Sequence, residues 1–314
     1  MRKIVKLLRR AIGISALHDE LQRKTQRILN RLEALERQAS LELKWRGHFS
    51  DKVDALLRRN FISDLAVDQY PTALLSQRFK LLSQNEEDGM TLALLRAAGA
   101  PNQTFVEIGS GASGGNSAVL AQEFGWRGLM VDIDPAKIAK ARGKFGNNDK
   151  VSFEAVAVTP ENINSLIEKH GLAGEVDLFS LDIDSFDYWV LEALTACQPR
   201  VMILEYNGNF GAERSLTIGR DTKLSKAFKG FHGASLVALT KLASRKGYRL
   251  LACDGSGTNA FFLRSDLRPE ISAVPPQVAF RPMRESTDPL RETLRTPKDL
   301  ETLAQERGLT LVEV

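Results

Sequence analysis

Cysteine is scarce in this sequence of 314 residues, which contains only Cys197 and Cys253. The two stand far apart and lack the close spacing of cysteine metal ligands, which argues against a disulfide-rich scaffold and a cysteine-ligated metal centre. Isolated cysteines are typical of a reducing compartment, where both are expected to be buried thiols.

Long hydrophobic runs are also missing. No apolar run approaches the roughly eighteen residues of a membrane-spanning helix, and the basic N-terminus mixes its apolar residues with charges, unlike a signal peptide. We therefore predict a soluble, cytoplasmic protein. Neither sign of charge is in large excess: 43 Lys and Arg residues oppose 39 Asp and Glu residues. This surplus is too small to predict nucleic-acid binding.

Residues 1–65 are predicted to form a helical extension. In residues 1–12 an apolar face opposes Lys and Arg side chains, a pattern that suits either an anionic membrane surface or a packing partner. Residues 17–43 favour a short coiled coil, through which the chain could form a homo-oligomer. The apolar residues at seven-residue intervals are Leu21, Ile28 and Leu35.

The most informative stretch, from Phe105 to Asp132, reads FVEIGSGASGGNSAVLAQEFGWRGLMVD. An apolar run enters a glycine-rich turn, and a helical pattern and a second apolar run follow. This order is that of the nucleotide-binding half of a Rossmann-like unit. Glycines let the backbone turn sharply and approach a ligand closely. Asp132 follows Gly111 by 21 residues, close to the spacing expected of an acid that binds ribose hydroxyls.

Apolar strands and helices keep alternating after Asp132. Further strands are predicted over 151–158, 176–183, 201–206, 248–253 and 260–264, and helices over 135–145, 163–169, 188–196 and 234–246. We expect a Rossmann-like, doubly wound α/β sheet of seven strands, mostly parallel. No helix separates the last two strands, so the last strand is expected to be antiparallel. The main domain is predicted over 66–267, and a proline-rich connector with a C-terminal appendage over 268–314.

Several of these phrases resemble a known family. VEIGSGASG and GLMVDID resemble the first two motifs of class I S-adenosylmethionine-dependent methyltransferases, and GWRGLMVDIDP is similar to a phrase of the FkbM-like group. The later phrases LFSLDIDSFDYWVLEAL and PRVMILEYN resemble a bacterial methyltransferase-like group. The resemblance covers roughly residues 90–265.

The resemblance implies that S-adenosylmethionine is the cofactor, with its methionine part held by Glu107 and by the backbone at Gly109 and Gly111. Glu107 stands within an apolar strand, where an unpaired charge would be costly, so a ligand amine or backbone amides must satisfy it. Ser113 replaces the third glycine of the usual pattern, and glycines follow it. We therefore expect a different loop shape that binds the same part of the cofactor.

The resemblance also assigns the other end of the cofactor. Asp132 would bind both ribose hydroxyls, Ile133 would lie against the adenine, and Ala157 would stand near the adenine edge. Asp182, at the end of a central strand, would face the methyl group and the acceptor.

The carboxylates after that strand suggest two kinds of chemistry. Asp182 or Asp184 could take a proton from an acceptor hydroxyl, as could His232, because histidine ordinarily titrates near neutral pH. His232 could equally be a cap or a solvent-facing residue. Alternatively, Asp182, Asp184 and Glu205, with Asn207, could hold a divalent cation. We favour the first interpretation, because oxygen ligands at this spacing are also ordinary loop caps.

The sequence thus predicts an S-adenosylmethionine-dependent methyltransferase that acts on a small or carbohydrate-type acceptor, at oxygen. The alternative is a non-catalytic scaffold, tethered through its N-terminal helices to a membrane or partner complex. An NAD-dependent dehydrogenase is disfavoured because no second catalytic domain is evident. The loop 207–233 is expected to line the acceptor pocket, and its basic residues favour an acidic acceptor unless they are simply solvated. The residues concerned are Phe210, Arg214, Arg220, Lys223, Lys226, Lys229 and His232.

Overall fold

The structure is a computed structural model that describes Lys3, 24–27, 29–32, 72–220, Thr222, 232–282, Thr302, 304–306 and 309–314. The chain divides into two units, Met1–Ser63 and Asp64–Val314. In the first unit, residues 24–27 and 29–32 are helical and exposed. The remainder of the predicted coil and, apart from Lys3, the predicted membrane-contact segment lie outside the described residues. Both stay predictions, and the scaffold hypothesis, which depends on them, gains no support.

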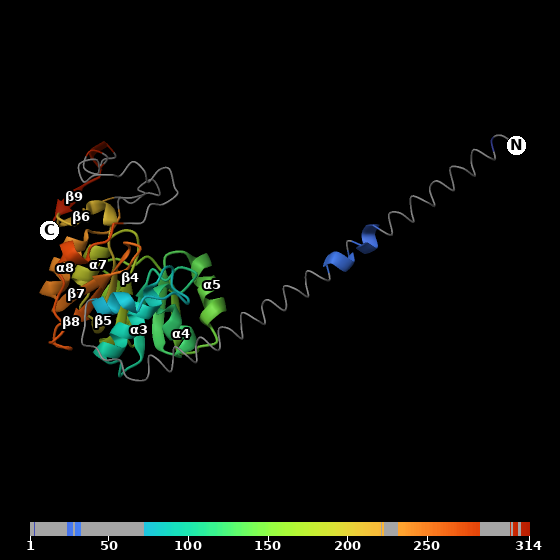
Figure 1. Ribbon diagram of the computed structural model, residues 1–314, viewed down its shortest axis with the longest axis horizontal. Coiled ribbons are helices and arrows are strands. Elements are labelled where there is room, and N and C mark those ends of the chain that lie inside the picture. The colour runs from blue at the N-terminus through green and yellow to red at the C-terminus, as the bar shows by residue number, and fades with distance from the viewer. Residues whose placement is uncertain are drawn as a thin grey trace. The chain divides into compact units, whose positions relative to one another are not determined.

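Seven strands form one sheet, in the order β3-β2-β1-β4-β5-β8-β7 (Figure 1). They are β1 (Thr104–Ile108), β2 (Arg127–Asp132), β3 (Val151–Ala155), β4 (Gly174–Leu181), β5 (Cys197–Glu205), β7 (Tyr248–Cys253) and β8 (Asn259–Arg264). The strands β3, β2, β1, β4 and β5 run parallel to one another, and β8 is antiparallel to both β5 and β7. The predicted Rossmann-like sheet of seven mostly parallel strands is confirmed, as is the antiparallel direction of β8, and β7 lies at the edge beside it.

Helices cover both faces of the sheet (Figure 1). One layer contains α3 (Glu87–Ala98), α4 (Ala118–Glu123) and α5 (Pro135–Phe145), and the other contains α6 (Ile163–Lys169), α7 (Asp187–Ala193) and α8 (Leu236–Arg245). The second layer shares one hydrophobic cluster with the sheet. With both faces covered, the central strand β4 is buried from Val176 to Leu181, which explains its continuous apolar sequence.

Local signals fix where several of these elements begin and end. The helix α5 begins after Asp134, whose Oδ1 accepts a hydrogen bond from Ala136 N at 2.8 Å, with proline at the first position. The third strand is shorter than predicted, because the chain after Ala155 leaves the sheet. Val156 and Ala157 instead line a cavity described below.

A second, two-stranded sheet pairs β6 (Leu216–Ile218) antiparallel with β9 (Leu311–Glu313). A small hydrophobic cluster packs here, formed by Phe210, Leu216, Ala304 and Leu309. Phe210 is fully buried in that cluster, so the expectation that it lines the acceptor pocket is wrong. In the proline-rich segment, α9 (Pro276–Ala279) contacts β7 and α8. The predicted domain boundaries at 65 and 267 stay predictions.

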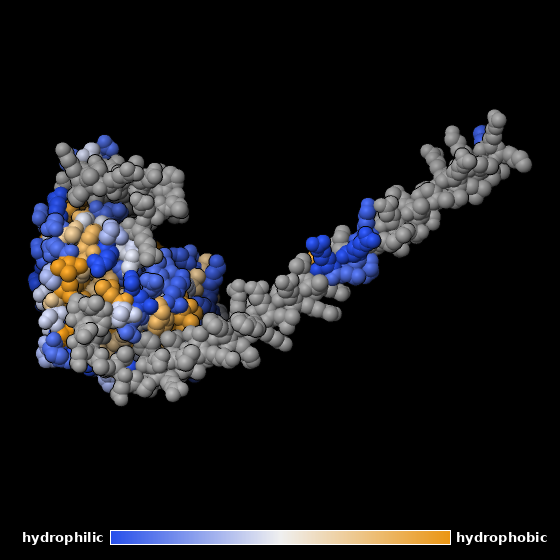
Figure 2. Space-filling view, viewed as in Figure 1, coloured by the Kyte–Doolittle hydropathy of each residue, from blue (hydrophilic) through white to orange (hydrophobic). Residues whose placement is uncertain are grey.

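The surface of the Asp64–Val314 unit mixes hydrophilic and hydrophobic areas on the face shown in Figure 2. Its exposed large hydrophobic side chains, among the described residues, are Ile133 and Val278, at 70% and 63% exposure. In the part of the chain that the structure describes, no helix combines the length and apolar character needed to cross a membrane.

Candidate functional site

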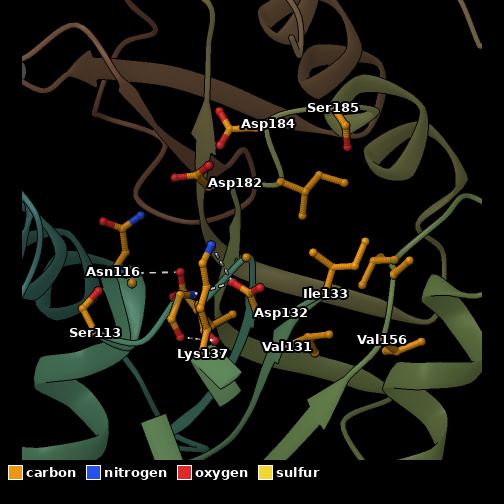
Figure 3. Close-up of a pocket in the computed structure, with 18 of the residues that line it drawn as sticks. Ser113, Asn116, Val131, Asp132, Ile133, Lys137, Val156, Asp182, Asp184 and Ser185 are labelled. Carbon is orange, nitrogen blue, oxygen red and sulfur yellow. Dashed lines mark hydrogen bonds and ion pairs between the residues drawn. The ribbon is translucent and has the colours of Figure 1, made fainter. Parts of the chain in front are cut away.

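A cavity of about 590 Å³ opens at the carboxyl ends of β1, β2 and β4 (Figure 3). Open α/β sheets bind their ligands at this edge. The residues predicted to bind a cofactor all line the cavity, and they are Glu107, Gly109, Gly111, Ser113, Asp132, Ile133, Ala157 and Asp182. The fold therefore brings these residues together, and their individual roles stay predictions.

The turn after β1 needs glycine at two positions that border the cavity. Gly109 has φ +90°, and a Cβ there would lie 1.5 Å from the carbonyl oxygen of Asp182. The Gly109 N–H donates to the Val131 carbonyl at 2.8 Å, which ties the turn to β2. Gly115 has φ +57°, and its Cβ would lie 2.1 Å from Glu107 Oε1. Gly115, which follows Ser113 by two residues, thus leaves room for the buried carboxyl group of Glu107.

Glu107 is a buried acid on β1, with 1% of its surface exposed. Its Oε2 accepts a hydrogen bond from the Ser117 hydroxyl at 2.5 Å, and its Oε1 accepts one from Asn116 N at 3.2 Å. Asn116 also lines the cavity and is labelled in Figure 3. Burial raises the pKa of Glu107 to about 7, although the hydrogen bonds from Ser117 and neighbouring groups oppose the rise. Protein donors therefore satisfy this carboxyl group in part, and the group still lines the cavity.

Replacing Glu107 by glutamine is expected to change how stability depends on pH. The folded pKa is about 7 and the reference value is 4.5, so between them the folded wild type binds more protons than the unfolded chain. Its free energy of unfolding therefore falls as pH rises through this window. Between about pH 5 and pH 8, titration of Glu107 lowers the free energy of unfolding of the wild type by about 2 to 3 kcal/mol. The Glu107→Gln variant does not show this contribution.

Denaturant unfolding of both proteins at each pH measures this difference. Glu161→Gln is the control, because Glu161 is exposed and the Arg220 guanidinium holds its pKa below the usual range. The free energy of unfolding of Glu161→Gln should fall with rising pH by as much as that of the wild type. Parallel pH profiles for wild type and Glu107→Gln would contradict the prediction.

Asp132 ends β2 and organises the turn facing it. Its Oδ2 accepts a hydrogen bond from Gly111 N at 3.0 Å, and its Oδ1 accepts one from Asp134 N at 2.8 Å. Lys137 Nζ approaches Oδ2 at 3.7 Å (Figure 3). Because a carboxylate offers about four lone-pair directions, Asp132 can hold this turn and still accept hydrogen bonds from ligand hydroxyls.

An apolar wall adjoins this carboxylate. Figure 3 shows Val131, Ile133 and Val156 on one side of the cavity, near Asp132. The adjacent Ala157 is exposed and also lines the cavity. A ligand with a flat apolar ring could cover the exposed Ile133 side chain with that ring, while sugar hydroxyls of the same ligand reach Asp132.

A cluster of acids and one histidine stands at the ends of β4 and β5. His232 Nδ1 lies 3.5 Å from Asp184 Oδ1 and 3.7 Å from Glu205 Oε2. Burial raises the pKa of Asp182 to about 7, and the charge of Asp184 acts in the same direction. Burial also raises the pKa of Glu205, helped by the charges of Asp182 and Asp184. Asp184 has φ +53°, a left-handed conformation that costs a non-glycine residue about 1–2 kcal/mol.

Two neighbouring polar residues have other tasks. Asn207, predicted beside Glu205 in the cation set, donates from Nδ2 to the His232 carbonyl at 3.0 Å and accepts from Asn209 N at 3.0 Å. Its side chain therefore holds the loop. Asp187 stands at the first position of α7, and it accepts hydrogen bonds from Ile183 N at 2.9 Å and Ser185 N at 3.0 Å.

The expected acceptor loop is only partly described. Lys223, Lys226 and Lys229 lie outside the described residues. Arg220 pairs with Glu161 at 2.8 Å. Of this predicted set, His232 is the member that the structure brings to the acidic cluster.

Sequence reasoning missed polar residues contributed by α3 and β8. Glu87 and Asn259 both line the cavity and are buried, and Asn259 Nδ2 donates to Glu87 Oε1 at 3.1 Å. Asn259 Oδ1 has no hydrogen-bond partner in the structure. The position of Asn259 at the start of β8 was the available signal. Because β8 pairs with β5, that position lies opposite Glu205.

Comparisons with protein-family models and with curated proteins gave no match. The chain is similar to a solved O-methyltransferase from Bacillus cereus in complex with SAH, at 16% identity over 68% of this chain and 96% of that chain, with a TM-score of 0.39. It is also similar to the mitomycin 7-O-methyltransferase MmcR, at 18% identity over 55% of this chain and 56% of that chain, with a TM-score of 0.33. A TehB-like SAM-dependent methyltransferase from Corynebacterium glutamicum is 15% identical over 55% of this chain and 85% of that chain, with a TM-score of 0.32. At these values the matches identify neither a ligand nor an activity for this chain.

Proposed function

We propose that this chain is an S-adenosylmethionine-dependent methyltransferase that methylates an oxygen of a small or carbohydrate-type acceptor. The observation that carries the proposal is one cavity that joins the glycine turn after β1, Asp132 at the end of β2, the buried Glu107 and the partly buried Asp182. A nucleoside with an amino-acid tail presents complementary groups. The phrases VEIGSGASG and GWRGLMVDIDP favour the same cofactor and, within that family, the FkbM-like group.

The cavity residues offer a partner for each part of this cofactor. Glu107 is placed to attract the ammonium group of the methionine part, close to the backbone at Gly109, Gly111 and Ser113. Asp132 has lone pairs left for both ribose hydroxyls. The adenine would lie on the apolar wall, which includes Ile133 and Ala157.

The chemical step needs a positioned acceptor and a group that takes its proton. The sulfonium of the bound cofactor supplies an electrophilic methyl group. Asp182 and Asp184, which follow β4, line the cavity where that methyl group would lie, and His232 Nδ1 lies 3.5 Å from Asp184 Oδ1. Holding the acceptor oxygen in line supplies much of the rate enhancement, and these side chains are the candidates to receive the hydroxyl proton.

The charge of the cavity bears on the acceptor. Its described lining is mainly acidic, with one lysine, and the charged residues are Glu87, Glu107, Asp132, Asp182, Asp184 and Lys137. A phosphorylated acceptor would meet like charges there. We therefore favour a neutral, hydroxyl-bearing acceptor over the acidic one that the basic loop residues suggest.

Calorimetry with S-adenosylhomocysteine tests the proposal on the full chain. We expect saturable binding at one site, with a dissociation constant of about 1 to 100 μM, or about −8 to −5 kcal/mol. NAD is the matched control, because it carries the same adenosine without a methionine part, and no saturable binding of NAD is expected. Failure to bind S-adenosylhomocysteine, or a preference for NAD, would sink the proposal. Mass spectrometry of ligands that co-purify with the protein addresses the acceptor.

A further inference from the structure

Asp184, Glu205 and His232 come from three separate segments: the loop after β4, the end of β5 and the segment before α8. One donor atom of each lies within 4.8 Å of the other two. We propose that these three residues bind a divalent metal cation, and that this cation holds the acceptor hydroxyl. The second part rests on the methyltransferase function proposed above, whereas the first does not.

The spacing of the donor atoms suits a cation between them. Metal–ligand bonds to carboxylate oxygen and imidazole nitrogen are about 2.0–2.2 Å long, so two ligands stand about 3 Å apart at right angles and about 4.2 Å apart when opposite. His232 Nδ1 lies 3.5 Å from Asp184 Oδ1 and 3.7 Å from Glu205 Oε2. Direct N–H···O hydrogen bonds would need about 2.7–3.2 Å.

Two of these donor atoms are buried and without a hydrogen-bond partner. They are Glu205 Oε2 and His232 Nδ1, and Glu205 as a whole is 7% exposed. A buried polar atom left without a partner costs about 1–3 kcal/mol. One bound cation would provide a partner for both atoms.

Neighbouring hydrogen bonds hold the three donors in place. Asn207 Nδ2 donates to the His232 carbonyl at 3.0 Å, and Gly233 N donates to the Ser185 carbonyl at 2.9 Å. The Asp187 carboxylate accepts hydrogen bonds from Ile183 N and Ser185 N, on either side of Asp184. The donors therefore sit on segments that are already tied together, as metal sites require of their surroundings.

The donor types narrow the choice of metal. Two carboxylates and one imidazole form a mixed oxygen and nitrogen set, which suits Mn²⁺ better than the all-oxygen sites typical of Ca²⁺ and Mg²⁺. Three protein ligands leave coordination positions for water or an acceptor, and Asp184 borders the cavity. A cation there would lower the pKa of a coordinated hydroxyl. His232 then acts as a ligand rather than as the base, in a set that omits Asn207 and Asp182, and Asp182, which lines the cavity, remains to receive the hydroxyl proton.

Titration of the chelator-treated full chain with MnCl₂, followed by the electron paramagnetic resonance of free Mn²⁺, tests the site. We expect one bound Mn²⁺ per chain, and at least a tenfold weaker affinity in both His232→Ala and Asp184→Asn. The second variant guards against misfolding, because the Asp184 side chain is 78% exposed. His170→Ala is the matched control, since His170 pairs with Glu154 elsewhere, and it should bind Mn²⁺ as wild type does.

A second measurement separates this proposal from the proposed function. Asp132→Ala should bind Mn²⁺ normally while losing affinity for S-adenosylhomocysteine, and Asp184→Asn should show the reverse. If wild type binds no stoichiometric Mn²⁺, with or without S-adenosylhomocysteine, or if His232→Ala binds it equally well, the metal site is refuted. The contacts of His232 Nδ1 with the two carboxylates, at 3.5 and 3.7 Å, would then account for the cluster. Mn²⁺ binding without S-adenosylhomocysteine binding would refute only the methyltransferase.

Discussion

Replacement of Asp132 by alanine is expected to weaken binding of S-adenosylhomocysteine about 100-fold, or about 2.7 kcal/mol. Two losses combine. The ribose hydroxyls lose a charged acceptor, which is worth about 1.5–3 kcal/mol. In addition, Gly111 N and Asp134 N lose the carboxylate oxygens that they contact at 3.0 and 2.8 Å, so the turn facing the ligand is held less firmly. Calorimetric titration of the variant and the wild type gives the two affinities.

Asp134→Ala provides the matched control for this experiment, because it removes the same charge two residues further along. Asp134 caps α5 through Ala136 N at 2.8 Å, and its loss should cost about 1 kcal/mol of stability. Its affinity for S-adenosylhomocysteine should stay near that of wild type. Equal affinities in wild type and Asp132→Ala, or equal losses in both variants, would show that Asp132 does not bind the ribose.

The local parts of this site follow from the sequence because turn chemistry and strand position are local properties. Gly109 and Gly111 have φ of +90° and +58°, as a sharp glycine turn requires. Asp132 ends one parallel strand, and Asp182 follows another directly. Residues at the carboxyl ends of neighbouring parallel strands meet at one edge, so their gathering in one cavity is predictable without coordinates.

Other parts depend on contacts between segments that are distant in the chain. Glu87 and Asn259 are 172 residues apart and meet through a 3.1 Å hydrogen bond, because α3 packs against β8 in the folded domain. The same holds for His232, which reaches Glu205 only because its loop returns to the end of β5. Asn207 is nearer in sequence, yet its side chain is used to hold that loop. Proximity in sequence therefore does not by itself identify the residue whose side chain lies beside Glu205 Oε2, which is His232 at 3.7 Å.

Gly109→Ala is expected to be the most disruptive single substitution at the site. Its Cβ would lie 1.5 Å from the carbonyl oxygen of Asp182, and its φ is +90°. Unfavourable φ and steric overlap together are expected to cost about 4 kcal/mol, because the obstructing atom belongs to the backbone and no side-chain rotation removes it. Relief requires β1 and the end of β4 to separate, which displaces Asp182 and opens the cavity.

Urea denaturation and calorimetry with S-adenosylhomocysteine measure these two consequences separately. Gly143→Ala is the control, because Gly143 lies in α5 with no atom within 4 Å of its added Cβ, and alanine there should stabilise the fold by about 1 kcal/mol. The two substitutions add the same methyl group and should shift stability in opposite directions. A Gly109→Ala protein that unfolds at the wild-type urea concentration and binds the ligand normally would mean that the turn after β1 does not set the shape of the cavity.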